Sequence, residues 1–76
     1  MNTIRAHVLD PSRVHKTLTW TVGEHVTEET YRRFKDDNGD LYVLVYYEDG
    51  KAEVRVVLKQ DWYLAKTALD QQDTHT

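Results

Sequence analysis

Two runs of apolar and aromatic side chains, separated by Asp49-Gly50, dominate the hydrophobic pattern of this chain. Both runs are rich in β-branched residues, and Asp-Gly is a dipeptide suited to a two-residue type I′ turn. We therefore predict a β-hairpin over residues 41–60 in which Glu48 pairs with Lys51. This register makes one face entirely apolar, whereas a shift of one residue would mix the two faces. The expected inward pairs are Tyr47/Ala52, Val45/Val54, Val43/Val56 and Leu41/Leu58.

The opposite face of the predicted hairpin is only half polar. Its pairs are Tyr46/Glu53, Leu44/Arg55, Tyr42/Val57 and Asp40/Lys59. Tyrosine and arginine are enriched at protein interfaces, where they supply large contact areas. We therefore expect a protein-binding surface on this face. Its proposed contact residues are Tyr42, Leu44, Tyr46, Arg55 and Val57. An intramolecular alternative has equal weight, in which a C-terminal helix covers the same side chains.

Two shorter alternating runs predict a second pair of strands. They cover residues 3–9 and 17–22. Asp10-Pro11-Ser12 ends the first run, because proline donates no hydrogen bond to a sheet. The two runs most simply form an antiparallel hairpin. Their inward side chains are Ile4, Ala6, Val8, Leu18, Trp20 and Val22.

Two helices complete the expected order of elements. Thr27 is a suitable N-cap for a helix that stops at residues 36–39, where Asn and Gly tolerate left-handed backbone angles. Asp61 is the expected N-cap of a second helix. That helix places Trp62, Ala65 and Leu69 on one face.

The predicted fold class is α+β, in the order β-β-α-β-β-α, with a single antiparallel sheet and helices packed mainly on one face. Residues 1–69 are expected to form a single domain, and residues 70–76 a disordered C-terminal tail.

Composition narrows the range of functions. The chain has 76 residues and no cysteine, which excludes disulfides and thiolate metal sites. Its net charge of −3 does not favour a general nucleic-acid binder. No apolar run approaches the ~20 residues of a membrane span, so we expect a cytoplasmic location. Because small chains gain stability by oligomerisation, a homodimer is one expected state.

The sequence contains only weak matches to motifs for catalysis or metal binding. The four histidines lack metal-ligand spacing, although His7 and His15 are expected to approach each other in space. The acidic turn at residues 36–40 does not match the EF-hand pattern. Residues 10–15 contain the residue types of a catalytic triad, but no nucleophile elbow surrounds Ser12. We therefore expect no enzyme, no catalytic residue, no metal and no cofactor.

These observations favour a small non-enzymatic protein-binding module, an adaptor or inhibitor of a larger protein. Phages and mobile elements use short chains of this kind against host enzymes, and that link is an analogy from size alone. The alternative is a nucleic-acid- or small-ligand-binding domain that uses the basic helix face of Arg32, Arg33 and Lys35. A small hydrolase or nuclease is the third hypothesis, and the acidic C-terminal half of the chain disfavours it.

Overall fold

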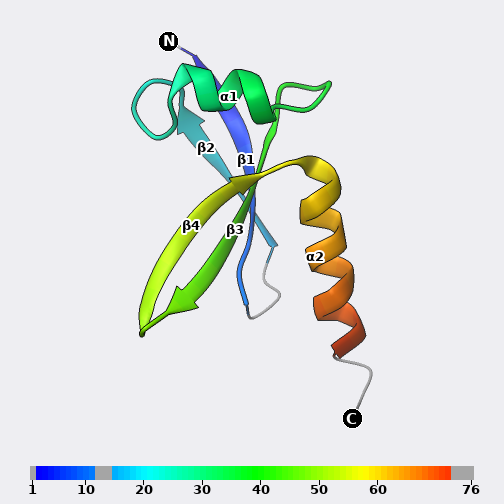
Figure 1. Ribbon diagram of the computed structural model, residues 1–76. Helices are drawn as coiled ribbons and strands as arrows, with labels where there is room; N and C mark the ends of the chain where they lie inside the picture. Colours follow the sequence, from blue (N-terminus) through cyan, green and yellow to red (C-terminus); the bar gives the residue numbers. More distant parts are fainter. Residues whose placement is uncertain (1, 12–14, 73–76) are drawn as a thin grey trace.

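The computed structural model describes residues 2–11 and 15–72 (Figure 1). The elements follow one another in the predicted order, and the α+β class is confirmed. They are β1 (Thr3–Leu9), β2 (His15–Thr21), α1 (Glu28–Phe34), β3 (Leu41–Glu48), β4 (Lys51–Val57) and α2 (Lys59–Gln72). Residues 70–72, which the sequence analysis assigned to a tail, belong to α2. The remainder of that predicted tail, residues 73–76, lies outside the described residues.

The strands form one mixed sheet in the order β2-β1-β3-β4. β1 with β2 and β3 with β4 form antiparallel pairs, but β1 and β3 run parallel over residues 6–9 and 41–44. The prediction of a purely antiparallel sheet is therefore wrong in this detail. The cause is α1, which lies across the end of the sheet where β1 begins, so that β3 starts at the same end (Figure 1).

The hairpin of β3 and β4 has the predicted register, with Glu48 opposite Lys51. Asp49 and Gly50 have φ angles of 54° and 77°. Positive φ at both central residues is what a type I′ turn requires. The local sequence therefore determined both the turn and the pairing that follows from it.

The hairpin ends two pairs earlier than the sequence predicted, because neither the Leu41/Leu58 pair nor the Asp40/Lys59 pair forms. Leu58 does not pair with Leu41, because β4 ends at Val57 and α2 begins at Lys59. The predicted N-cap of this helix, Asp61, lies instead within its first turn, beside the positive end of the helix dipole.

The first helix begins as the sequence predicted. The side-chain oxygen of Thr27 accepts a hydrogen bond from the backbone N–H of Thr30. The helix ends at Phe34, shortly before the acidic turn that leads into β3. None of its residues is fully buried, so α1 makes only a limited contact with the sheet.

Helix α2 packs against one side of the sheet, called here the helix-covered face. Trp62 is 1% exposed, and its Nε1 donates a hydrogen bond to the carbonyl oxygen of Val43 at 3.1 Å. It packs with Leu9 and Tyr42 in the core. Trp62 thus faces inward, as predicted for the apolar face of this helix. Further half-buried side chains packed against this cluster are Leu44, Val57, Ala65 and Leu69.

The opposite side of the sheet, called here the open face, carries residues 4, 6 and 8 of β1 and residues 16, 18 and 20 of β2. It continues with residues 41, 43, 45 and 47 of β3 and residues 52, 54 and 56 of β4. Ala6, Leu41 and Val43 are 0% exposed, but Tyr47 is 66% and Val54 59% exposed. The prediction that this face is buried is confirmed at its centre. It is wrong towards the hairpin tip and at Leu18 on the edge strand, which is 45% exposed.

Within the described part of the chain, neither helix is long and apolar enough to cross a membrane.

Candidate protein-binding surface

The structure separates the five predicted contact residues into two groups. Tyr42 is 5% exposed, and Leu44 and Val57 are half-buried against the core cluster that α2 completes. Tyr46 and Arg55 remain accessible, with Tyr46 37% exposed. The intramolecular alternative therefore holds for the first three residues. A binding role for Tyr46 and Arg55 stays a prediction.

Tyr46 and Arg55 contact each other on the helix-covered face of the hairpin. The guanidinium carbon of Arg55 lies 5.2 Å from the centroid of the Tyr46 ring, which is the geometry of a cation–π interaction. Tyr46 also lies beyond Leu44, the last residue of β3 that pairs with β1. The contact holds two long side chains in place, which lowers the conformational entropy that a partner must remove on binding.

A groove next to Tyr46 separates α2 from the hairpin. It encloses about 420 Å³, and its walls are mostly apolar. Leu44 and Tyr46 line it from β3, and Ala65 and Leu69 line it from α2. The other lining residues are Leu9, Asp10, Pro11, Val45, Tyr47 and Ala68. Pockets of a few hundred cubic ångströms with apolar walls are the usual sites for burying an apolar group of a ligand.

The sequence analysis did not predict this groove. It placed Ala65 and Leu69 on the inward stripe of α2 but did not relate them to the hairpin. Ala68 is the useful signal, because two alanines three residues apart leave space where a helix faces a sheet. That space becomes a groove only because α2 packs on the Tyr46 side of the sheet. The sequence analysis did not decide whether the helix covers this side.

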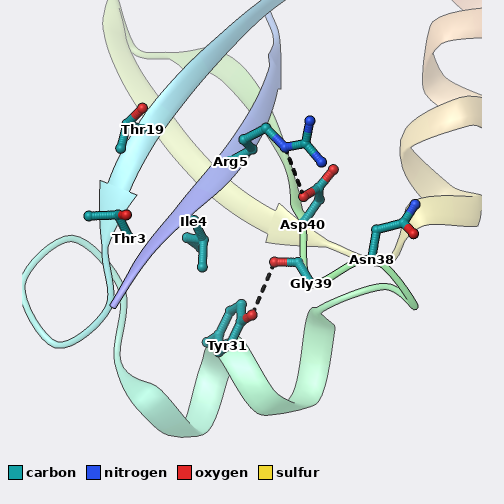
Figure 2. Close-up of a pocket in the computed structure, with 8 residues that line it drawn as sticks. All are labelled: Thr3, Ile4, Arg5, Thr19, Tyr31, Asn38, Gly39 and Asp40. Atoms are coloured by element: carbon teal, nitrogen blue, oxygen red, sulfur yellow. Dashed lines mark hydrogen bonds and ion pairs between the residues drawn. The ribbon is translucent and has the colours of Figure 1, made fainter. Parts of the chain in front are cut away.

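A second, polar cleft lies where α1 meets β1 (Figure 2). It encloses about 350 Å³. Tyr31 donates a hydrogen bond to the carbonyl oxygen of Gly39 at 3.0 Å, and Arg5 Nε donates to Asp40 Oδ1 at 3.3 Å. Because the charged side chains of this cleft already pair with each other, its geometry favours a structural role over ligand binding.

His7 and His15 approach each other as the sequence predicted, with ring centroids 5.7 Å apart. His7 Nε2 lies 2.9 Å from Asp40 Oδ2, and His7 Nδ1 lies 3.5 Å from Thr17 Oγ1. The order of these groups resembles a catalytic relay, but Thr17 is the direct cross-strand partner of His7. Ordinary cross-strand packing therefore accounts for the contact. Among the described residues, no group of three or more histidines and carboxylates is placed to hold a metal ion.

Asp36 organises the turn that leads into β3. Its Oδ1 accepts backbone N–H bonds from Asn38 and Asp40, and its Oδ2 accepts the Tyr42 hydroxyl, all at 2.9 Å. Burial by itself raises the pKa of Asp36, but these hydrogen bonds and the nearby Lys59 ammonium outweigh it, so the pKa lies below its ordinary value.

Tyr42 is the neutral partner of this carboxylate. Burial, followed by the hydrogen bond to Asp36, raises the pKa of Tyr42 well above its ordinary value. Its hydroxyl therefore stays protonated at neutral pH and remains a donor. Tyr42 has a structural role in the core, where its ring also packs on Trp62 with centroids 5.4 Å apart.

The alternative basic surface is exposed on and beside α1. Arg32, Arg33 and Lys35 are all solvent-accessible. Glu28 and Glu29 occupy the first turn of the same seven-residue helix. Because acidic and basic side chains lie within one short helix, they do not build the extended positive field that phosphate binding uses. The nucleic-acid hypothesis stays a prediction without geometric support.

Comparison with known proteins gives no further guide to function. No family model matches the sequence, and no curated protein and no solved structure shows significant similarity to the chain. The function must therefore be inferred from the geometry of the chain itself.

Proposed function

We propose that this chain is a small non-enzymatic protein-binding module, an adaptor or inhibitor of a larger protein. Its binding site is the groove between α2 and the hairpin, and its occupant is an apolar segment of the partner. The observation that carries the proposal is the groove itself, which combines mostly apolar walls with the Tyr46–Arg55 pair beside it.

The chemistry of the groove indicates what the partner presents. A volume of about 420 Å³ admits one or two large apolar side chains, so a leucine, methionine or phenylalanine anchor fits it. Arg55 is exposed close to the groove, and its guanidinium favours a carboxylate in the same partner segment. We therefore expect an apolar anchor that lies next to an acidic residue.

The polar groups of the fold support binding over catalysis. His7 is hydrogen-bonded to Asp40, and the Tyr42 hydroxyl donates a hydrogen bond to Asp36. Neither His7 nor Tyr42 lines the groove. The groove offers an apolar surface to a partner, whereas general acid–base catalysis needs titratable groups that converge on the bound substrate.

A displayed library of random short peptides tests the proposal. The full chain is immobilised, enriched peptides are synthesised, and their affinities are measured for the chain and for the double variant Tyr46→Ala, Arg55→Ala. We expect enriched peptides to share an apolar anchor and to lose about 10-fold or more in affinity for the variant, as contacts at an aromatic–arginine hot spot do.

The matched control removes an exposed apolar residue and an exposed arginine elsewhere. Leu64 is 68% exposed on α2 and does not line the groove, and Arg33 is exposed on α1. The variant Leu64→Ala, Arg33→Ala should bind the enriched peptides as the unaltered chain does. Equal binding to both double variants, or a library with no enrichment, would overturn the proposal.

A further inference from the structure

The groove beside Tyr46 has part of its wall built from the edge of β3. Val45, Tyr46 and Tyr47 all line it, although successive side chains of a strand point to opposite faces of a sheet. Three consecutive residues can line one groove only where the edge of their strand faces it. The backbone of β3 is therefore part of the groove wall, in addition to the side chain of Tyr46.

This edge is open because β1 ends before β3 does. β1 pairs with β3 only as far as Leu9 opposite Leu44, whereas β3 continues to the hairpin turn. The same register would place Pro11 opposite Tyr46, and proline has no N–H to donate to the ladder. In Figure 1 the end of β1 lies between the hairpin and α2, and both Leu9 and Pro11 line the groove.

The hairpin turn shows which backbone groups of β3 face the groove. Glu48 and Lys51 flank the two-residue turn, and such a pair exchanges both of its backbone hydrogen bonds. Because bonded and non-bonded pairs alternate, the N–H and C=O groups of Val45 and Tyr47 point away from β4, towards the place that β1 leaves.

Three of these groups have no partner in the sheet. The parallel ladder would supply the N–H of residue 11 to the Val45 carbonyl, and that residue is a proline. Tyr47 lies beyond the end of the ladder altogether. Among the described residues, no backbone hydrogen bond outside the helices and strand ladders involves Val45 or Tyr47. The edge therefore offers the Val45 C=O and the Tyr47 N–H and C=O to a ligand.

We propose that the partner segment binds in this groove as an extended β-strand, next to β3 in the place that β1 leaves. The inference rests on the proposed function and adds the conformation of the bound segment. An extended main chain complements donors and acceptors along a strand edge, and adding a strand to a sheet is a common mode of peptide recognition. A helical segment satisfies its own backbone groups, so it would leave Val45 and Tyr47 unpaired.

The walls of the groove determine the side-chain pattern of the partner strand. Alternate side chains of that strand point towards α2, where Ala65, Ala68 and Leu69 line the groove. Arg55 lies over the Tyr46 ring on the same side of the sheet, so a carboxylate of the partner belongs to the same alternate set. We therefore expect enriched peptides to carry apolar residues at positions i and i+2, whereas a bound helix would need a spacing of three or four.

N-methylation of single peptide bonds in an enriched peptide tests this mode of binding. Each methyl group removes one backbone N–H and leaves every side chain in place. In a strand, the N–H groups of alternate residues face the same neighbouring strand. We expect methylation at alternate positions to weaken binding by about 10-fold or more, because a hydrogen bond is lost and the methyl group obstructs the pairing. Methylation at the intervening positions should leave the affinity nearly unchanged.

Two proline variants test the edge of β3 itself. Tyr47→Pro removes the N–H that faces the groove, whereas Ala52→Pro removes an N–H that faces the outer edge of β4. Tyr47 and Ala52 form one cross-strand pair, so the two prolines disturb the hairpin at the same level. We expect Tyr47→Pro to bind enriched peptides about 10-fold or more weakly, and Ala52→Pro to bind them as the unaltered chain does. Circular dichroism confirms that each variant is folded.

The outcomes separate this inference from the proposed function. Peptides that lose affinity for Tyr46→Ala, Arg55→Ala but tolerate methylation at every position would overturn the strand and leave the groove as the binding site. Equal binding to Tyr47→Pro and Ala52→Pro would also overturn it. A dimer of the chain that Tyr47→Pro dissociates, seen by sedimentation equilibrium, would assign the edge to a second copy and overturn the choice of a partner segment. A library with no enrichment would overturn the proposed function and this inference with it.

Discussion

At the scale of single residues, Asp36 is the side chain on which the turn before β3 depends. It is exposed over only 6% of its side-chain surface, and it accepts hydrogen bonds from Asn38, Asp40 and Tyr42. These bonds fix the backbone at the position where β3 starts and orient the Tyr42 ring beneath α2. The residue thus links a local turn to the core.

We expect Asp36→Ala to lower the free energy of unfolding by about 1–3 kcal/mol, because three donors lose their acceptor. Urea denaturation at neutral pH measures this change. Asp37→Ala is the matched control, since the neighbouring carboxylate is exposed, and it should change the free energy by less than about 0.5 kcal/mol. Equal effects of both substitutions would contradict the assigned role.

The pH dependence of stability follows from the same residue. The pKa of Asp36 is lower in the folded chain than its ordinary value of 3.8, so the folded state favours the ionised carboxylate. Its contribution is complete above the unfolded pKa and is lost as the pH falls through the lower folded pKa. The difference in stability between the chain and Asp36→Ala should therefore shrink below about pH 4.

At the scale of elements, the hairpin of β3 and β4 shows how local chemistry sets a long stretch of structure. The turn at Asp49 and Gly50 selects the pairing of Glu48 with Lys51, and every later pair follows from it. This hairpin extends past its neighbour β1, so its tip has support from only two strands. An isolated two-stranded hairpin is marginally stable, which makes the turn important for the tip.

We expect Gly50→Ala to lower the free energy of unfolding by about 1–2 kcal/mol, because Gly50 has a φ of 77° that an L-residue with a Cβ adopts at a cost. Apart from Gly50 and its two chain neighbours, no residue has an atom within 4 Å of the added methyl group, so the effect reports on the backbone conformation. Asp49→Asn is the control and should be nearly neutral, since Asn also tolerates left-handed angles. Thermal unfolding measures both variants, and an unchanged midpoint for Gly50→Ala would contradict the turn assignment.

At the scale of the whole molecule, the sheet presents two surfaces that differ in their surroundings. α2 covers one face through Trp62 and leaves the groove beside Tyr46, whereas the other face is open towards the hairpin tip. The described chain is elongated, with extents of 46 × 29 × 17 Å. A core of few buried side chains gives a chain of this size limited stability.

The homodimer expected from the small size of the chain predicts that the thermal midpoint rises with chain concentration, because dimerisation would stabilise the folded state by mass action. Calorimetry or circular dichroism over a wide concentration range measures the dependence. A concentration-independent midpoint for the unaltered chain would argue against association.

Much of the fold was accessible from the sequence because it depends on neighbouring residues. The Thr27 cap and the turn at Asp49 rest on interactions within a few positions of the chain, and the apolar stripe of α2 can be read from local spacing although it packs on distant residues. The candidate site was accessible only in part. Tyr46 and Arg55 were predicted to share one face of the hairpin, and they do, but the groove requires α2 and the hairpin together.

The sequence by itself therefore determined the elements, their order and the register of the hairpin. The tertiary structure decided that β1 and β3 run parallel, and that α2 covers the face with Tyr42 and leaves the face with Val54 open. Both faces of the hairpin carry enough apolar side chains to pack on a helix, so the periodicity did not choose between them. The choice follows from contacts distant in sequence, above all the insertion of Trp62 beside Tyr42 and its hydrogen bond to Val43.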